Sequence, residues 1–312
     1  MTGLAFLFPG QGSQAAGMGR DLAAAFSEAR AVYDRADAAL APFRLSISHV
    51  SFEGTEEELK QTAVTQPAIL VHSVAVFEVL KVRGFAPTLL AGHSLGEWSA
   101  LVAAGALTLE DAVVLVHRRG TFMQEAVAAG QGAMGAVLGL DGAAVAAACA
   151  EIADATGEAV SAANFNSPEQ TVIAGTANAV AKASELLKQR GAKRVLPLPV
   201  SAPFHCALMK PAEEKLSPFL DAAPFADLSI PVVTNVDVLA NLSGEEAREA
   251  LRRQVCSPVR WVETVERLSR ETGGAIEVGP GTVLAGLSKR IAKEWPVRTT
   301  SDAEGVRRLL AG

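Results

Sequence analysis

Ser94 is the residue whose surroundings point most directly to chemistry. It lies in the segment LLAGHSLGEW (89–98), between Gly92 and Gly96. A short apolar stretch precedes Gly92 and a helical pattern follows Glu97, so the serine is expected on a sharp turn from a strand to a helix. Flanking glycines remove side chains that would clash at such a turn, and the first amides of the helix can bind a developing oxyanion. The segment predicts a nucleophilic serine; the alternative is that Ser94 only caps the helix.

A serine nucleophile needs a general base, and the chain has five histidines to compare. His72 falls within an apolar helical pattern and is expected in the core, whereas a helical count places His117 on a polar face that we expect to be solvated. His49 lies in an irregular stretch, and the turn directs the neighbouring His93 away from the serine. His205, in PFHCALMK, lies at a loop that begins a helix, which is a common place for functional side chains. By elimination, His205 is the predicted base.

Arg119 occupies an unexpected face of its helix. The apolar residues of the helix expected at 109–127 share one face, and Arg119 falls on it between Leu115 and Met123. Arginine is seldom buried unless it is paired. Arg119 therefore either forms a structural salt bridge, or extends its aliphatic chain so that the guanidinium reaches the surface, or places the guanidinium in the active site. In the last case its fork of donors suits the carboxylate of an acyl substrate.

Alternating strand and helix patterns predict an α/β fold with a parallel sheet that is covered on both faces. Its expected strands are 4–8, 88–92, 230–236 and 275–279, and its expected helices are 20–41, 67–82, 95–104, 109–127, 207–221, 244–254, 260–271 and 282–293. Residues 128–198 instead show the order β-α-β-β-α-β of a ferredoxin-like unit. Its strands are expected at 133–139, 158–163, 170–175 and 193–198, and its helices at 142–154 and 177–190. We therefore expect a small domain, 128–198, inserted into a larger α/β domain, 1–127 plus 199–312.

The composition narrows the classes of function. With 28 Lys and Arg against 34 Asp and Glu, the net charge is −6, so no nucleic-acid or anionic-membrane partner is expected. The apolar run near the start, LAFLF, is too short for a signal peptide or a membrane span. Three widely spaced cysteines (Cys149, Cys206 and Cys256) fit neither a disulfide framework nor a zinc site. We expect reduced thiols in a cytoplasmic protein that holds no metal and no cofactor.

Six motifs occur along the chain in a fixed order: FPGQGSQ, GHSLGEWSAL, RRGTFMQEA, NFNSPEQTVIAG, PFHCALMKPA and EVGPG. Together they resemble the malonyl-CoA:acyl carrier protein transacylases of fatty acid synthesis, to which the acyltransferase domains of polyketide synthases are related. The resemblance runs nearly from end to end. It implies an α/β-hydrolase-like large domain with a parallel sheet and an inserted ferredoxin-like domain, which agrees with the pattern of elements above.

The resemblance also implies a two-step, ping-pong reaction. Malonyl would pass from malonyl-CoA to the serine hydroxyl, and then to the phosphopantetheine thiol of holo acyl carrier protein. Ser94 matches the nucleophile, His205 the base, and Arg119 the residue that binds the malonyl carboxylate.

Four further positions match the motifs of the family. The backbone amides of Gln11 and Leu95 correspond to the oxyanion hole, and Gln254 to the residue whose main-chain carbonyl holds the imidazole. Phe204 departs from the common bacterial pattern, in which a small residue precedes the histidine. In polyketide synthase acyltransferase domains, phenylalanine at this position accompanies a preference for malonyl, so Phe204 is expected to contribute to substrate selectivity.

Two alternatives and one surface hypothesis remain from the sequence. An α/β-hydrolase with esterase or thioesterase activity would place an acid after the serine and a histidine late in the chain, but no acid between Ser94 and His205 stands out. A non-catalytic binding protein on this fold is the second alternative. One of the two basic clusters, KQRGAKR (188–194) or KRIAK (289–293), is hypothesised to steer docking of an acidic carrier protein.

Overall fold

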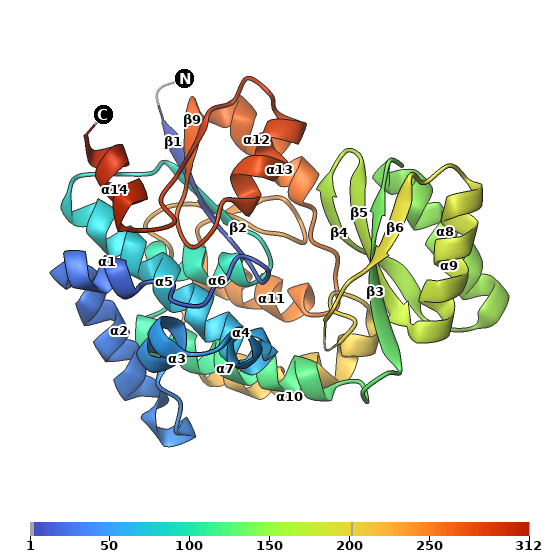
Figure 1. Cartoon of the computed structure of the whole chain (residues 1–312), viewed down its shortest axis with the longest axis horizontal. Coiled ribbons are helices and arrows are strands. Elements are labelled where there is room, and N and C mark those ends of the chain that lie inside the picture. Colours follow the sequence, from blue (N-terminus) through green and yellow to red (C-terminus); the bar gives the residue numbers. More distant parts are fainter. Residues whose placement is uncertain (1–2, 201, 312) are drawn as a thin grey trace.

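The computed structural model describes residues 3–200 and 202–311, which form a mixed α/β fold built on two sheets (Figure 1). The predicted domain limits at 1 and 312 lie outside these residues. Within them, the larger sheet has six strands, in the order β10 (Val297–Thr299), β9 (Gly274–Glu277), β1 (Leu4–Phe8), β2 (Leu89–Gly92), β7 (Val232–Val233) and β8 (Ala240–Asn241). Its paired neighbours run parallel except β7 and β8. The predicted α/β class with a parallel-rich sheet is confirmed.

Helices cover both faces of this sheet because the residues of β1 alternate between two cores. Phe6 and Phe8 face a large cluster that includes the helices preceding and following β2, whereas Ala5 and Leu7 face a smaller one on the opposite side. The helices on the first side are α1 (Arg20–Ala25), α2 (Ser27–Leu40), α3 (Ile47–Glu53), α4 (Glu56–Lys60), α5 (Thr62–Val82), α6 (Leu95–Ala103), α7 (Leu109–Glu125), α10 (Lys210–Ala222), α11 (Gly244–Gln254) and α14 (Ala303–Leu310). Those on the second side are α12 (Trp261–Glu271) and α13 (Val283–Ile291). Short 3₁₀ turns lie at Ala41–Phe43 and Ala207–Met209.

The smaller sheet lies beside the larger one, on the right of Figure 1, and is antiparallel throughout. Its strands are arranged in the order β4-β5-β3-β6. Along the chain its elements are β3 (Gly132–Leu138), α8 (Gly142–Thr156), β4 (Val160–Ser167), β5 (Gln170–Thr176), α9 (Ala177–Gln189) and β6 (Arg194–Pro197). Both helices pack on one face of this sheet in a core of their own, which leaves the other face toward the large sheet.

The helix expected at 67–82 begins five residues earlier, at Thr62, and encloses Pro67. Proline has no N–H, so the carbonyl of Ala63 loses its usual partner four residues later. The Nδ1 atom of His117 lies 2.9 Å from that carbonyl oxygen and replaces the missing donor. The expectation that His117 is solvated is therefore wrong: its side chain is half-buried and bonded to α5, because the first turn of α5 lies beside this part of α7.

Several short elements differ from the expected ones. The strand expected at 230–236 contracts to Val232–Val233, because the chain then turns so that the amide of Thr234 bonds to the carbonyl of Leu239 and leads into β8. Helices α3, α4 and α14 and strands β8 and β10 have no counterpart among the expected elements. The turn after β7 matters for the site, since it carries Asn235.

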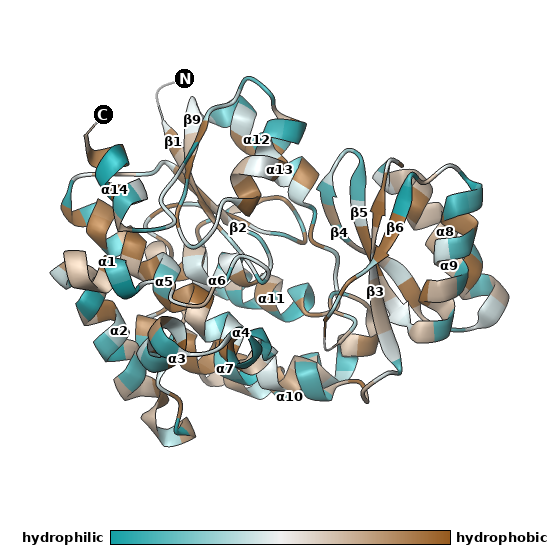
Figure 2. Ribbon diagram, viewed as in Figure 1, coloured by the Kyte–Doolittle hydropathy of each residue, from teal (hydrophilic) through white to brown (hydrophobic). Residues whose placement is uncertain are grey.

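α5 is long and apolar enough to cross a membrane, yet 83% of its apolar window is buried inside the fold. It is apolar on all sides because α2, α3, α6 and α7 surround it. Hydrophobic residues gather on such central elements, while hydrophilic residues are prominent on outer helices such as α9 and α12 (Figure 2). α5 is therefore the central helix of the core.

His72 lies fully buried in α5, as expected, and its Nδ1 is 3.2 Å from the hydroxyl of Tyr33. Burial lowers the pKa of His72 from 6.5 to about 4. Between these two values the unfolded chain binds a proton that the folded chain does not, so stability falls as the pH falls from 6.5 toward 4.

We expect the titration of His72 alone to lower the free energy of unfolding by about 2 kcal/mol between pH 8 and pH 5. Denaturant unfolding of the wild-type protein and of His72→Asn, which keeps an acceptor near Nδ1 but does not titrate, would measure it. The variant should lose less stability than the wild type between pH 8 and pH 5. Equal losses would contradict the assignment.

Candidate active site

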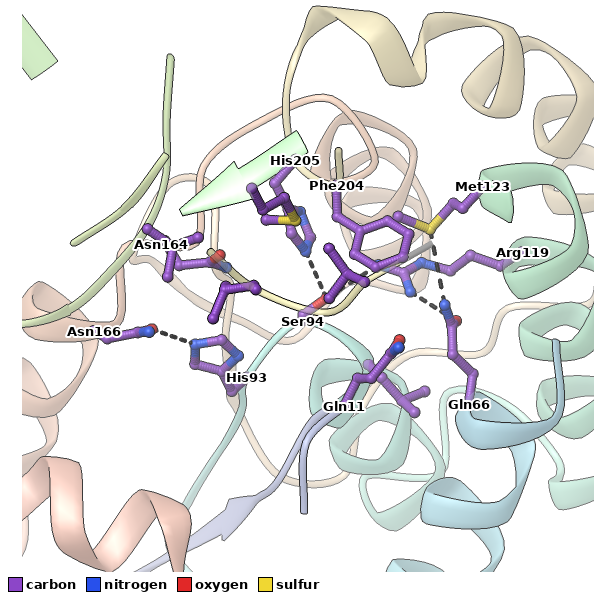
Figure 3. A pocket seen from close by; sticks show the side chains of 15 residues that line it. Gln11, Gln66, His93, Ser94, Arg119, Met123, Asn164, Asn166, Phe204 and His205 are labelled. Carbon is purple, nitrogen blue, oxygen red and sulfur yellow. Dashed lines mark hydrogen bonds between the residues drawn. The ribbon is translucent and has the colours of Figure 1, made fainter. Parts of the chain in front are cut away.

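A cavity between the two sheets brings the predicted residues together (Figure 3). Loops and helices of the large sheet supply one wall, and strands of the small sheet supply the other. The lining residues are Gln11, Gln66, His93, Ser94, Leu95, Arg119, Met123, Met134, Asn164, Asn166, Val172, Leu198, Val200, Phe204 and His205. Of the seven predicted site residues, Gln254 is absent from this lining and lies buried behind Arg119.

Ser94 lies at the turn from β2 to α6, as the glycine spacing predicted. Its backbone has φ 51° and ψ −105°, a conformation that residues other than glycine rarely adopt. The turn is tight: a Cβ on Gly92 would lie 1.8 Å from the carbonyl carbon of Gly96, and one on Gly96 would lie 1.9 Å from the carbonyl oxygen of Phe8. Among the described residues the Ser94 side chain makes no capping hydrogen bond to α6, so the capping alternative is wrong.

The hydroxyl of Ser94 and the imidazole of His205 form a hydrogen-bonded pair. Ser94 Oγ is 2.7 Å from His205 Nε2, and His205 Nδ1 is 2.9 Å from the main-chain oxygen of Gln254. Because a carbonyl only accepts, Nδ1 carries the proton and Nε2 is left to accept the serine proton. Burial, and then the charge of Arg119, lower the pKa of His205 to about 3, so the imidazole is neutral at pH 7.

Arg119 is 1% exposed and points into the cavity beside the serine. Its Nη1 donates to Gln66 Oε1 at 2.7 Å, and its Nη2 donates to Gln254 Oε1 at 3.0 Å and to Ser94 Oγ at 3.2 Å. Burial lowers its pKa to about 10, which leaves it charged at neutral pH. Within residues 3–200 and 202–311 no salt bridge includes Arg119, so the structural-salt-bridge alternative is wrong. Its guanidinium has neutral hydrogen-bond partners and faces the cavity.

The side chains beside this pair are positioned to shape the substrate space. Phe204 and Met123 line the cavity next to Ser94 and Arg119 (Figure 3). Gln11 lines it from the loop after β1, with its Nε2 3.5 Å from Thr62 Oγ1. Leu95 is the first residue of α6, so its amide has no acceptor within the helix.

The small sheet reaches the cavity through the asparagines of β4. His93, which turns away from Ser94 as expected, has its Nε2 2.8 Å from Asn166 Oδ1 (Figure 3). Its ring meets Trp261 edge to face, with ring centroids 5.5 Å apart. Burial lowers the pKa of His93, so this imidazole is neutral and links the two walls of the cavity.

Three buried polar residues of the site were not anticipated from the sequence: Gln66, Glu97 and Asn235. Gln66 lies in α5 and supports Arg119, and its Nε2 lies 3.8 Å from Met123 Sδ. Glu97 is 1% exposed, and burial raises its pKa to about 7. The available signal was a carboxylate within an otherwise apolar helix start, LGEWSALVA. Gln66 and Asn235 are of common residue types and lie far from Ser94 in the sequence.

The arrangement can carry out acyl transfer through a serine ester. It contains a serine on a strained turn, a neutral imidazole to take its proton, and a cation beside the reacting oxygen. The imidazole is held by a main-chain carbonyl rather than by the carboxylate of a hydrolase triad. Among the described residues, no group of three or more His, Cys, Asp or Glu side chains is placed to hold a metal ion.

Comparison with known proteins is consistent with this chemistry. Residues 5–308 match the model of the acyl transferase domain family. The malonyl CoA-acyl carrier protein transacylase of Escherichia coli K12 is 50% identical over 293 residues, 93% of each chain. The protein of the same name from Bacillus subtilis 168 is 47% identical over 307 residues, 98% of this chain and 96% of its own.

Two solved structures show that the likeness extends to the fold. One is an acyl carrier protein S-malonyltransferase from Vibrio cholerae, with a TM-score of 0.95 and 47% identity over 99% of this chain and 100% of its own. The other is a malonyl-transacylase in complex with a type II polyketide synthase acyl-carrier protein, with a TM-score of 0.95 and 46% identity over 99% of both chains. By sequence and fold, the chain belongs to the malonyl CoA-acyl carrier protein transacylase family and is an acyltransferase.

Proposed function

We propose that this chain transfers malonyl from malonyl-CoA to the phosphopantetheine thiol of holo acyl carrier protein through a malonyl ester of Ser94. The observation that carries the proposal is the position of Arg119, whose Nη2 lies 3.2 Å from Ser94 Oγ while its other hydrogen-bond partners are neutral. A malonyl thioester carries a carboxylate two bonds beyond the reacting carbonyl, so that carboxylate can reach the guanidinium during attack. The names of the relatives support this substrate.

The proposed reaction has two balanced halves. Ser94 Oγ attacks the thioester carbonyl as His205 Nε2 takes the hydroxyl proton; the coenzyme A thiolate then leaves and receives that proton. In the second half, His205 takes the proton of the carrier-protein thiol, the sulfur attacks the serine ester, and Ser94 Oγ recovers the proton. The amides of Gln11 and Leu95 stabilise the oxyanion in both halves. Gln254 holds His205 with Nε2 toward the serine throughout.

We assign substrate selectivity near the α-carbon to Phe204. Its ring is 8% exposed and lines the cavity beside Ser94, where bulk would restrict substituents on an acyl group. This position supports a preference for malonyl over branched extender groups.

The domain division that we propose follows the two sheets: a hydrolase-like large domain, 1–127 plus 199–312, and a ferredoxin-like small domain, 128–198. The small sheet supports the second description, because its β-α-β-β-α-β order and its strand order β4-β5-β3-β6 are those of a split βαβ unit. We place the protein in the cytoplasm, which suits its three free cysteines.

The acidic carrier protein is proposed to dock on one basic surface formed by both clusters. Lys193 pairs with Glu169, and Arg290 Nη1 lies 3.5 Å from Gln170 Oε1, so the clusters flank the same turn between β4 and β5. That turn follows Asn166 of the cavity wall, which places the basic surface beside the active site. Opposite charges steer association most strongly at low salt.

Reversing three exposed charges of this surface (Lys188→Glu, Arg194→Glu and Lys289→Glu) should therefore slow transfer to the carrier protein about tenfold at low salt. The deficit should shrink as salt screens the charges. The control is Arg308→Glu on α14, which lies at the left of Figure 1, at the opposite end of the molecule from the small sheet. An unchanged carrier-protein rate with an unchanged salt dependence would exclude this docking surface.

The proposed function is tested by following malonyl-CoA consumption with and without holo acyl carrier protein. Transfer predicts malonylated carrier protein and slow release of free malonate. Rapid malonate release that the carrier protein does not divert would favour the thioesterase alternative instead. No consumption at all would leave the binding-protein alternative.

A further inference from the structure

Glu97 is a buried carboxylate that neither lines the cavity nor has a part in the proposed reaction. It follows Ser94 by three residues, on the first turn of α6, and is 1% exposed. Its Oε2 accepts two hydrogen bonds, from Gln254 Nε2 at 2.8 Å and from the amide of Asn235 at 2.9 Å. An ionisable residue in this position needs an explanation, because burying a carboxyl group is costly.

The first of these bonds determines which way the Gln254 amide points. Its Nε2 donates to Glu97 Oε2 and to the main-chain oxygen of Ser94, at 2.8 and 3.1 Å. Its Oε1 is thereby turned toward Arg119 Nη2, 3.0 Å away. The reversed amide would point its N–H groups at the guanidinium, which has no acceptor, and its oxygen at Glu97 Oε2, the same oxygen that already accepts from the amide of Asn235. Glu97 therefore keeps an acceptor in front of Arg119.

The same contacts reach the nucleophile and the base. Gln254 provides the main-chain oxygen that holds His205 Nδ1. Asn235, held by its amide to Glu97, accepts from the amide of Ser94 at 2.7 Å and donates from Nδ2 to the carbonyl of Gly92 at 2.7 Å. The strained turn at Ser94 is thus tied to the same carboxylate through Asn235.

We infer that Glu97 is a positioning residue, whose acceptor oxygen orients Gln254 and Asn235 and through them fixes Arg119, His205 and the Ser94 turn. The inference rests on the proposed function, since it concerns how the malonyl-binding arginine and the serine–histidine pair are held. In this role Glu97 acts by accepting hydrogen bonds and not through its charge. A neutral acceptor of the same shape can therefore replace it.

The test compares Glu97→Met, which keeps the length but removes the acceptor, with Glu97→Gln, which keeps an acceptor oxygen. Acylation of Ser94 by malonyl-CoA and by acetyl-CoA is measured for each variant and the wild type. We expect the methionine variant to lose about tenfold in malonyl transfer, as for one lost hydrogen bond to a charged group, and to lose part of its malonyl-over-acetyl preference. The glutamine variant should recover both to within about twofold.

The selectivity ratio separates positioning from simple stability, because loss of folded protein lowers both rates equally. A methionine variant with the wild-type ratio would overturn the inference, and so would a glutamine variant as impaired as the methionine variant. If Glu97→Met does not fold, Gln254→Met removes the same side-chain link while keeping the main-chain oxygen. It should show the same loss of malonyl preference, and an unchanged ratio would overturn the inference. A wild-type protein that malonyl-CoA does not acylate would refute the proposed function instead.

Discussion

Replacing His205 by alanine is expected to slow acylation of Ser94 by roughly 10²–10⁴-fold, the usual contribution of a general base. The imidazole is the group that takes the serine proton in this geometry, with Nε2 2.7 Å from Ser94 Oγ. It is neutral and ready to accept at pH 7, because burial and the nearby Arg119 charge lower the pKa of His205 to about 3. Rapid-quench measurement of the malonyl-enzyme would give the rate directly.

The matched control is His49→Ala, since His49 is exposed at the surface of α3. Its acylation rate should equal that of the wild type. If His205→Ala were acylated at near the wild-type rate, His205 would not be the general base. Another group would then have to take the proton of Ser94.

Replacing Arg119 by alanine should weaken malonyl transfer by roughly 1.5–3 kcal/mol, the range for a lost charge-assisted hydrogen bond. The variant should also favour acetyl-CoA relative to malonyl-CoA. The malonyl carboxylate loses its partner when Arg119 is removed, whereas an acetyl group has no carboxylate and loses no such contact. Measuring kcat/KM for both thioesters gives the change in preference.

Arg118→Ala is the natural control for this arginine. Its guanidinium stacks over the ring of Phe219, 3.9 Å from the centroid, and does not line the cavity. It should leave the malonyl-to-acetyl ratio unchanged. An Arg119 variant with unaltered selectivity would contradict the carboxylate role.

Local pattern was sufficient to find the residues at the centre of the site. The glycines around Ser94 require a tight turn, which the structure shows, and helical periodicity alone placed Arg119 on a buried face. His205 followed by elimination. The role of Gln254 came only from family resemblance, since a main-chain carbonyl leaves no signal in residue type.

The supporting residues could not be predicted because they depend on contacts between distant segments. Asn235 meets the turn at Ser94 only after β7 ends early, and the sequence indicated a longer strand there. His117 was misjudged for a related reason: its partner is a carbonyl of α5 that Pro67 leaves unbonded. Periodicity describes one helix at a time and does not show which group of a neighbouring helix one of its polar side chains will meet.

The short helices α3, α4 and α14 were missed because each has at most eight residues. A window of that length gives too few repeats of a helical period to stand out. The longer helices that cover the sheet, and the apolar runs of β1, β2 and β9, were found with at most shifted ends.

The most direct test of the central claim is the intact mass of the protein after brief exposure to malonyl-CoA, followed by addition of holo acyl carrier protein. The wild type should gain one malonyl group and lose it to the carrier protein, while Ser94→Ala should gain none. An adduct of equal yield on Ser94→Ala, or one that the carrier protein cannot remove, would contradict a malonyl-Ser94 intermediate.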